Sequence, residues 1–194
     1  MNKNIYFVSS NKRKVDSYRK RLAEIGWNLV NINKTVPECR DFDCENVALD
    51  KMKTVREIVQ DRPVFVEDSG LEIEELNKFP GSHIKILTEM IGLEKFGEIL
   101  GSRKVHARFV YAIVFLDTEN DIKSFVGDEK GFMWYNDSKN VSDLRDIFCH
   151  EMFPNQPLSL LDEVQNSEYE QAWTKKDAMA GLIGFLRDES SCFW

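Results

Sequence analysis

The sequence lacks any long apolar run. No stretch of its 194 residues is long and apolar enough to span a membrane, and the opening segment MNKNIYFVSS is too short in apolar residues for a signal peptide. We therefore expect a cytoplasmic protein that does not contact a membrane. Hydrophobic residues still make up 42% of the chain, which is enough for a core. The length predicts a single domain over residues 1–194, or two small lobes around one cleft.

Cysteine and histidine are also scarce. The cysteines are Cys39, Cys44, Cys149 and Cys192, and no two of them form a CxxC pair. The histidines are His83, His106 and His150, and no two stand at ligand spacing. We expect free buried thiols, and a metal or redox site that includes the neighbours Cys149 and His150 is the alternative.

An excess of positive charge is missing as well. The net charge is −7, which argues against a general nucleic-acid binder, because such proteins carry a broad basic face. A small anionic ligand in one basic pocket remains compatible with this balance. The segment VSSNKRK, residues 8–14, is the place for such a pocket, because it holds three positive charges.

Hydrophobic periodicity predicts alternating strands and helices. Strands are expected over residues 4–9, 27–32, 63–67, 104–117, 121–126 and 131–135, with a further extended segment over 71–76. Helices are expected over residues 12–25, 43–60, 83–91, 93–100 and 173–187. Turns are expected at 68–70 and 79–81, whereas 136–168 reads as polar and irregular. The pattern predicts a mixed α/β sheet with a cleft where its two halves meet.

The segment VSSNKRK stands at a predicted strand-to-helix junction. The first N–H groups of a helix have no partner in the helix, so they and the helix dipole favour an anion. Ser9, Ser10 and Asn11 are small and polar, which lets backbone approach a phosphate, and Lys14 would reach the same oxygens. The alternative is a plain helix N-cap followed by solvated lysines.

Two adjacent carboxylates end the strand predicted at 63–67. Glu67 and Asp68 would point to opposite sides if extended, but a turn at Ser69-Gly70 would bring both toward one cleft. Carboxylates that close repel, and Mg²⁺ relieves the repulsion while bridging to a substrate phosphate. Glu45 is a third candidate oxygen ligand. The alternative is a solvated acidic turn.

Together these motifs resemble the inosine triphosphate pyrophosphatase family, which clears non-canonical purine nucleoside triphosphates. The family's strand followed by T-G-N-x-x-K corresponds to residues 9–14, its E-N-A to 45–47, its V-E-D-S/T-G-L to 66–71, and its P-G with a following basic residue to 80–85. Residues 107–109 (Ala-Arg-Phe), 125–127 (Phe-Val-Gly) and Gly131 also match in type and order. The match runs in register from residue 4 to about residue 135.

The resemblance implies an elongated, mixed α/β fold with two lobes around a central nucleotide cleft, a homodimer and a Mg²⁺ cofactor. The implied reaction is attack by water on a nucleoside triphosphate such as dITP or ITP, which gives monophosphate and pyrophosphate. By position, the resemblance assigns Lys14, Glu67 and Asp68 to catalysis. It assigns metal binding to Glu45, Glu67 and Asp68, and substrate binding to Ser9, Ser10, Asn11, Lys14, Ser69 and Lys85.

The second half departs from the family pattern. Asp146 and the hydrophobic residues after it are what remain of F-G-W/Y-D-P, and the S-H-R that reads the purine falls on Trp173-Thr174-Lys175. An upstream family lysine falls on Tyr169. The family lysine after E-N-A falls on Asp50, with Lys51 one residue later.

We expect these differences to change the choice of base. Asp146, Trp173 and Lys175 remain candidates for substrate binding. Trp173 would stack on a base, with a core position in the last helix as the alternative, and Lys175 would replace the lost arginine as a point donor.

Three functions remain open at this stage. The first is a Mg²⁺-dependent pyrophosphohydrolase with altered base recognition. The second is a sensing module that binds a dITP-like ligand with little turnover and signals to a larger effector protein, as would suit anti-phage defence. The third is a structural protein with a vestigial fold. The apolar end Cys192-Phe193-Trp194 either packs on its own fold or fills a partner's groove.

Overall fold

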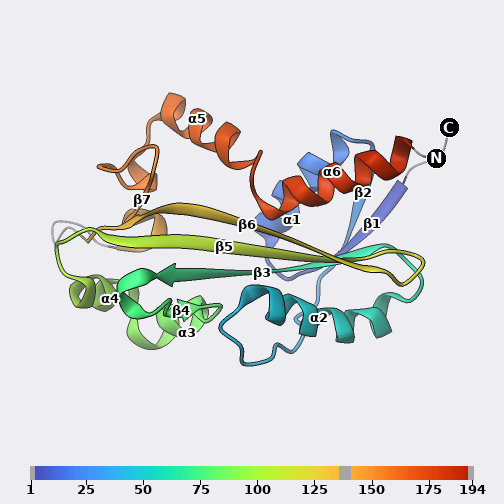
Figure 1. Cartoon of the computed structure of the whole chain (residues 1–194), viewed down its shortest axis with the longest axis horizontal. Helices are drawn as coiled ribbons and strands as arrows, with labels where there is room; N and C mark the ends of the chain where they lie inside the picture. Colours follow the sequence, from blue (N-terminus) through green and yellow to red (C-terminus); the bar gives the residue numbers. More distant parts are fainter. Residues whose placement is uncertain (1–2, 136–140, 192–194) are drawn as a thin grey trace. The chain divides into compact units, whose positions relative to one another are not determined.

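A computed structural model describes residues 3–135 and 141–191 of the chain (Figure 1). Its strands are β1 (Lys3–Val8), β2 (Trp27–Ile32), β3 (Val64–Ile73), β4 (Pro80–Gly81), β5 (Val105–Leu116), β6 (Ile122–Met133) and β7 (Phe148–His150). Its α-helices are α1 (Lys12–Ala23), α2 (Cys44–Val59), α3 (Ile84–Ile86), α4 (Leu93–Leu100), α5 (Glu163–Trp173) and α6 (Ala178–Ser191). The fold is therefore mixed α/β, as the sequence predicts.

The strands pair into one mixed sheet in the order β2-β1-β3-β5-β6-β7, with β4 paired to β3. β1 runs parallel to both β2 and β3. β4 pairs with β3 and β7 pairs with β6 in antiparallel register. A parallel pair needs a crossover connection, and here α1 joins β1 to β2 while α2 precedes β3.

The chain divides into two compact units. The first unit comprises Met1–Asp68, Tyr111–Gly127 and Asp177–Trp194, and the second comprises Ser69–Val110 and Asp128–Lys176. The boundary in β3 falls between Asp68 and Ser69, so the predicted site residues are divided between the two units.

In the first unit, α1 and α6 cover one face of the sheet and α2 covers the other (Figure 1). Between α1, α6 and the sheet, Phe7 stacks on Phe65 with ring centroids 4.5 Å apart, and Leu22 is fully buried. The apolar residues of α1 recur at helical spacing, so one side of that helix meets the sheet. This packing fixes the direction in which the side chains of α1 approach β3.

The second unit has a hydrophobic core of its own. Its fully or nearly fully buried members include Leu71 of β3, Phe96 of α4, Met133 of β6 and Phe148 of β7. Gly97 of α4 lies so close to the Tyr135 ring that a Cβ atom there would stand 2.1 Å from Tyr135 Cδ2. Close packing of this kind requires a glycine at position 97.

Two predictions about strands are wrong. The expected turn at 68–70 does not exist, because β3 runs without interruption from Val64 to Ile73. The strands expected at 121–126 and 131–135 are one strand, β6. Glycines at 70, 127 and 131 suggested breaks, but Gly127 and Gly131 instead allow close approach, since a Cβ atom would stand 2.6 Å from Ala178 N and 2.2 Å from Cys149 O.

The prediction for the C-terminal third is also partly wrong. The region expected to be irregular contains β7 and α5, and Trp173 ends α5 rather than beginning the last helix. The last helix, α6, starts at Ala178. In this helix Ala178, Met179, Leu182 and Leu186 are buried, and Ile183 is partly buried.

Two sequence-based expectations concern cysteine and membrane spans. Cys44 and Cys149 are buried, as expected. Cys39 is partly exposed, and Cys192 lies outside the described residues together with Phe193 and Trp194. Within residues 3–135 and 141–191, no helix combines the length and apolar character that a membrane crossing requires.

Candidate functional site

The turn between β1 and α1 is organised by its own polar side chains. Asn11 is the N-cap of α1, where its Oδ1 accepts from the Lys14 N–H over 3.3 Å. Ser9 Oγ accepts from the Asn11 N–H over 3.1 Å. Ser10 and Asn11 are exposed and Ser9 is partly exposed. The predicted N-cap is therefore present, and it presents a polar, accessible turn.

Lys14 is more than a solvated lysine. Its Nζ lies 2.5 Å from Glu67 Oε2, and the exposed fractions of the two side chains are 29% and 1%. Glu67 follows Phe65 by two residues on β3, so it shares the face that packs against α1. The alternation of the strand thus places Glu67 under the first turn of α1, beside Lys14.

Asp68 faces the other side of β3, as expected for the next residue of a strand. Its Oδ1 accepts from Lys51 Nζ of α2 over 2.6 Å, and the exposed side-chain fractions are 10% for Asp68 and 12% for Lys51. Lys51 Nζ also lies 2.9 Å from Glu38 Oε1 and donates to the Glu67 carbonyl oxygen over 3.2 Å. The two carboxylates are therefore neither a solvated turn nor on one face, because each is buried against a different helix.

Each of these carboxylates keeps one oxygen unused. Glu67 Oε1 and Asp68 Oδ2 are buried and have no hydrogen-bond partner among the described residues. Burial raises the pKa of Asp68 above its usual value, although Lys51 beside it acts in the opposite direction. Burial, with Asp68 close by, also raises the pKa of the Cys44 thiol. Two unsatisfied buried carboxylate oxygens indicate that a further cationic or donor group belongs here.

The three predicted metal ligands do not form a ready-made cage. Glu45 lies in the first turn of α2, where Asp43 caps the helix by accepting from the Glu45 N–H over 2.7 Å. Among the described residues, no group of three or more His, Cys, Asp or Glu side chains is arranged to hold a metal ion. Mg²⁺ needs only one or two carboxylates, because waters and substrate phosphates complete its coordination. The unused oxygen of Asp68, on the face of β3 that meets α2, fits that requirement.

Two predicted substrate residues belong to the second unit. Ser69 continues β3 directly after Asp68 and is partly buried. Lys85 lies in α3 with 84% of its side chain exposed, and its Nζ is 3.8 Å from Glu89 Oε1. A weak surface pair of this kind leaves the lysine available to an anion.

Asp146 already has a structural role. Its Oδ2 accepts from the backbone N–H groups of Ser142 and Asp143, both over 2.9 Å, which closes a capping box in the short helix Leu144–Asp146. These hydrogen bonds hold the pKa of Asp146 below its usual value, although partial burial opposes the shift. Asp146 was predicted to bind substrate, and Oδ2 of its carboxylate is engaged in these structural hydrogen bonds.

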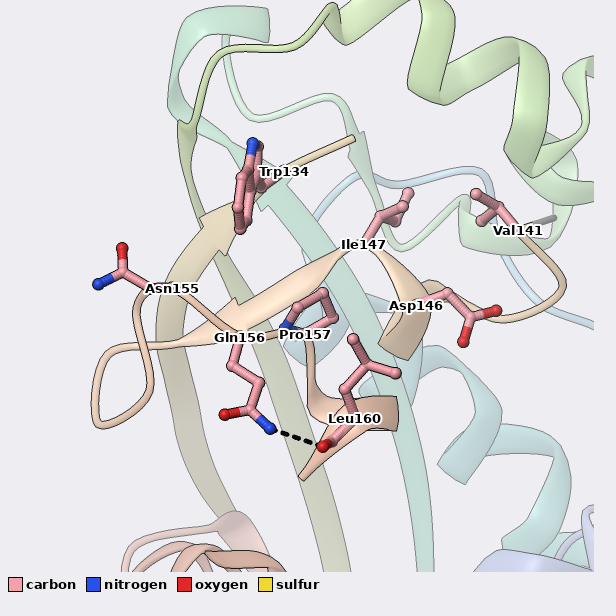
Figure 2. A pocket seen from close by; sticks show the side chains of 8 residues that line it. All are labelled: Trp134, Val141, Asp146, Ile147, Asn155, Gln156, Pro157 and Leu160. Carbon is pink, nitrogen blue, oxygen red and sulfur yellow. Dashed lines mark hydrogen bonds between the residues drawn. The ribbon is translucent and has the colours of Figure 1, made fainter. Parts of the chain in front are cut away.

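Asp146 also lines a cavity of about 180 Å³ in the second unit. Figure 2 shows this pocket with its lining residues Trp134, Val141, Asp146, Ile147, Asn155, Gln156, Pro157 and Leu160. Trp134 supplies aromatic surface, and Lys104 Nζ stands 4.8 Å from its ring centroid. Pockets for whole drug-sized ligands measure roughly 300–1,000 Å³, so this one fits only a part of a nucleotide.

The residues proposed to contact the base differ from one another in their burial. Trp173 packs, partly buried, against the core of the second unit, and it does not line the pocket of Figure 2. Lys175 is exposed in the segment between α5 and α6. Tyr169, which stands at the place of a family lysine, is buried and donates to Glu129 Oε1 over 2.7 Å. Thus Lys175 is accessible to a ligand, whereas Tyr169 is committed to the core.

Comparison with known proteins identifies the family of the chain. A sequence model of the Ham1 family matches residues 5–169. The chain belongs to the Ham1 family. The inosine triphosphate pyrophosphatase of Saccharomyces cerevisiae is 32% identical to this Ham1 chain over 141 residues, which cover 67% of the chain and 70% of that protein. The dITP/XTP pyrophosphatase of Ignicoccus hospitalis is 27% identical over 136 residues, covering 70% and 72%.

Solved structures of Ham1 proteins share the fold. The Ham1 protein of Staphylococcus aureus superposes with a TM-score of 0.72 at 22% identity and covers 95% of this chain and 99% of that one. A HAM1 protein from Coxiella burnetii gives a TM-score of 0.75 at 18% identity, with 96% and 99% covered. The Ham1 sequence match ends at residue 169, just before the Trp173-Thr174-Lys175 segment in which the sequence departs from the family pattern.

Sequence reasoning missed several residues of this Ham1 site. Lys51 was noticed only as a lysine displaced by one position, and Glu38 carried no motif at all. Glu129 carried a signal in principle, because a carboxylate in the middle of an otherwise apolar face indicates a buried partner. Trp134 had no such signal, since an aromatic residue at a strand end is usually part of the core.

Proposed function

We propose that the protein hydrolyses non-canonical purine nucleoside triphosphates, such as dITP and ITP, to monophosphate and pyrophosphate with Mg²⁺. The observation that carries the proposal is the pair of buried carboxylates, Glu67 and Asp68, that hold Lys14 and Lys51 and each keep one oxygen without a partner. The names of the relatives support the substrate class, because they are inosine triphosphate and dITP/XTP pyrophosphatases.

The turn at residues 9–14 would bind the phosphates. Ser10 and Asn11 are exposed, and the N-terminus of α1 favours an anion. Lys14 lies on the first turn with 29% of its side chain exposed, so its ammonium can reach a phosphate oxygen while Glu67 orients it. A charge-assisted hydrogen bond contributes about 1.5–3 kcal/mol, more than the helix dipole at roughly 0.3–1 kcal/mol. Lys14 therefore dominates phosphate binding in this scheme.

The carboxylates of β3 would act on the attacking water. In the reaction, the oxygen of water forms a bond to phosphorus, the bond between the α- and β-phosphates breaks, and pyrophosphate leaves. The proton of the water passes to a carboxylate, for which Asp68 with its unused Oδ2 is the candidate. Glu67 holds Lys14 on the other face of β3.

Asp68 would hold Mg²⁺ through its unused oxygen, with Glu45 from the first turn of α2 as a second candidate ligand. Glu67, predicted as a third ligand, lies on the other face of β3 and would act through Lys14. When bound, Mg²⁺ would neutralise phosphate charge and lower the pKa of a water. Lys85 and Lys175 belong to the second unit, and both are exposed, so each is accessible to an anionic group.

The test is a product analysis. The protein is mixed with dITP and Mg²⁺ at stoichiometric concentration, free nucleotide is removed, and bound and released species are separated by ion-exchange chromatography. Monophosphate and pyrophosphate are expected, and a chelator in excess over Mg²⁺ should abolish them. ATP in place of dITP serves as the matched control, because only the 6-position of the purine and the sugar differ.

One specific observation favours a second function. The residues that read the base in the family are replaced here, and Tyr169 is locked to Glu129 in the core. If intact dITP stays on the protein without release of pyrophosphate, the protein is a sensing module, and co-purification with a larger effector should follow. Release of neither product and no retained nucleotide would contradict both functions.

We also infer a homodimer. Support comes from large apolar side chains left exposed in the second unit, where Ile86 and Met90 are 52% and 80% exposed. They stand four residues apart, so they share one side of a helical segment. Light scattering on the purified protein tests this, and a monomer at micromolar concentration would contradict it.

A further inference from the structure

The Lys51 ammonium occupies the position beside Asp68 at which a cation is most needed. Its three N–H donors have three acceptors, namely Asp68 Oδ1 at 2.6 Å, Glu38 Oε1 at 2.9 Å and the Glu67 carbonyl oxygen at 3.2 Å. Only 12% of the Lys51 side chain is exposed. Lys51 therefore neutralises Asp68 from within the site and not from the solvent.

The same carboxylate has room for a second cation. Asp68 Oδ2 and Glu67 Oε1 are buried, and neither has a hydrogen-bond partner among the described residues, although the Cys44 thiol lies close to the Asp68 carboxylate. A divalent ion on Asp68 Oδ2 would meet the Lys51 ammonium across one carboxyl group. Like charges at such a separation repel strongly where solvent is largely excluded. Full occupancy by both cations is therefore unfavourable.

Glu38 offers Lys51 another partner. It already contacts the ammonium at 2.9 Å, and 55% of its side chain is exposed, so it belongs to the solvent edge of the site. A lysine side chain has a flexible stem of four carbons, which allows the ammonium to move without a change in the helix. If Lys51 leaves Asp68, it keeps an ion pair with Glu38.

We propose that Lys51 holds Asp68 while no metal is bound and moves toward Glu38 when a divalent cation binds Asp68. Lysine and metal then compete for a single carboxylate. The inference rests on the proposed function, because it takes Asp68 as a metal ligand. Lys51 is a positioning residue in this scheme: it holds the Asp68 carboxylate in place before the metal and its nucleotide arrive.

The experiment measures metal binding in the absence of nucleotide. Mn²⁺ is titrated into the full chain, and the free ion is followed by its electron paramagnetic resonance signal. Lys51→Met should bind Mn²⁺ roughly five- to a hundredfold more tightly than the wild type, because the competing ammonium is gone. In the double variant Lys51→Met/Asp68→Asn the gain should disappear.

Lys53→Met is the matched control. Lys53 lies on the same helix, is 78% exposed, and pairs with Asp50 at 3.1 Å. The substitution removes the same charge close to the site, so it reports any general electrostatic effect. We expect its Mn²⁺ affinity to equal that of the wild type. An equal gain in Lys51→Met and Lys53→Met would overturn the proposal.

A second measurement uses the wild-type protein and does not depend on the folding of a variant. Lysine acetylation rates are measured by peptide mass spectrometry with and without Mg²⁺. The rate at Lys51 should rise with Mg²⁺, while the rate at Lys53 stays constant as an internal standard. An unchanged rate at Lys51 overturns the competition even if dITP is hydrolysed. Absence of Mn²⁺ binding in every form overturns both the competition and the metal part of the proposed function.

Discussion

Tyr169 donates its phenolic hydrogen to Glu129 Oε1 over 2.7 Å, and both side chains are buried. Burial and the neighbouring Glu129 raise the pKa of Tyr169, so the phenol stays a donor. The pair ties α5 to β6 within the second unit. The residue that stands at the place of a family lysine thus helps to hold α5 on the sheet.

Tyr169→Phe should therefore lower the free energy of unfolding. The substitution removes the donor and leaves Glu129 Oε1 buried with one partner fewer, which costs about 1–3 kcal/mol. Tyr6→Phe is the matched control, because Tyr6 OH accepts an exposed hydrogen bond from Arg62 over 3.2 Å. That variant should lose no more than about 0.5 kcal/mol. Urea unfolding followed by circular dichroism measures both, and equal losses would contradict the assignment.

Asp68→Asn should abolish turnover. The amide keeps the size of the side chain but removes the charge that holds Lys51 and would hold the metal. We expect pyrophosphate release from dITP to fall by at least about 10²–10³-fold. Asp16→Asn changes a carboxylate on α1 that is 59% exposed and pairs with Arg19, and it should leave the rate unaltered. An unaffected rate in Asp68→Asn would remove Asp68 from the catalytic scheme.

His150 should make the fold less stable in mild acid. Burial lowers the pKa of His150 from its usual 6.5, with Lys176 acting in the same direction and Glu151 in the opposite one. Below about pH 6.5 the unfolded chain therefore binds a proton at His150 more readily than the folded chain does. The free energy of unfolding falls as the pH drops through that range. Above pH 6.5 His150 is neutral in both states and the effect vanishes.

The measurement compares urea unfolding at about pH 7.5 and about pH 5.5. The free energy of unfolding should decrease less between these two pH values in His150→Asn than in the wild type. The variant has no imidazole at position 150 that the unfolded chain could protonate. His83→Gln changes a histidine elsewhere in the second unit and should retain the wild-type loss. Identical pH dependence in His150→Asn and wild type would show that other groups dominate.

Gly127→Ala should destabilise the first unit. A Cβ atom at position 127 would stand 2.6 Å from the backbone nitrogen of Ala178 and 2.8 Å from Asp177 Cα, which cannot move without shifting the start of α6. Overpacking of this kind costs about 1–3 kcal/mol. Gly184→Ala is the control, because nothing lies within 4 Å of its Cβ position in α6. It should stabilise by about 0.5–1 kcal/mol in thermal or urea unfolding.

The sequence was a good guide where periodicity and caps agree. The segment from β1 through α2 was predicted almost residue by residue, since Asn11 and Asp43 cap their helices and apolar residues recur at helical spacing. The expected turn after Glu67 was wrong because Asp68-Ser69-Gly70 has turn composition but lies inside a strand. Partners from α1 and α2 make those polar residues compatible with burial. No local pattern contains that information.

The sequence predicted which residues belong to the candidate site, but it did not predict how they are arranged in space. Lys14, Glu67 and Asp68 were singled out, yet their separation onto two faces follows from pairing between β3 and β1, which is a contact far apart in sequence. Trp173 was expected in the last helix, because the stretch before α6 has no strong stop signal at that point. The actual division into α5 and α6 depends on Asp177, whose carboxylate accepts from the Ala180 N–H over 2.8 Å.

Lys51 shows that a side chain can contact a carboxylate from the position next to the one at which it was expected. Neighbouring positions on a helix point about 100° apart, so a shift of one residue would remove a short side chain from its partner. A lysine spans the difference with its long stem, and here it still places its ammonium 2.6 Å from Asp68. A comparison made position by position would count the family lysine at position 50 as lost, although the ammonium of the next residue contacts Asp68. A search for divergent relatives should ask whether a lysine ammonium reaches the carboxylate on the strand, whichever position of the helix supplies that lysine.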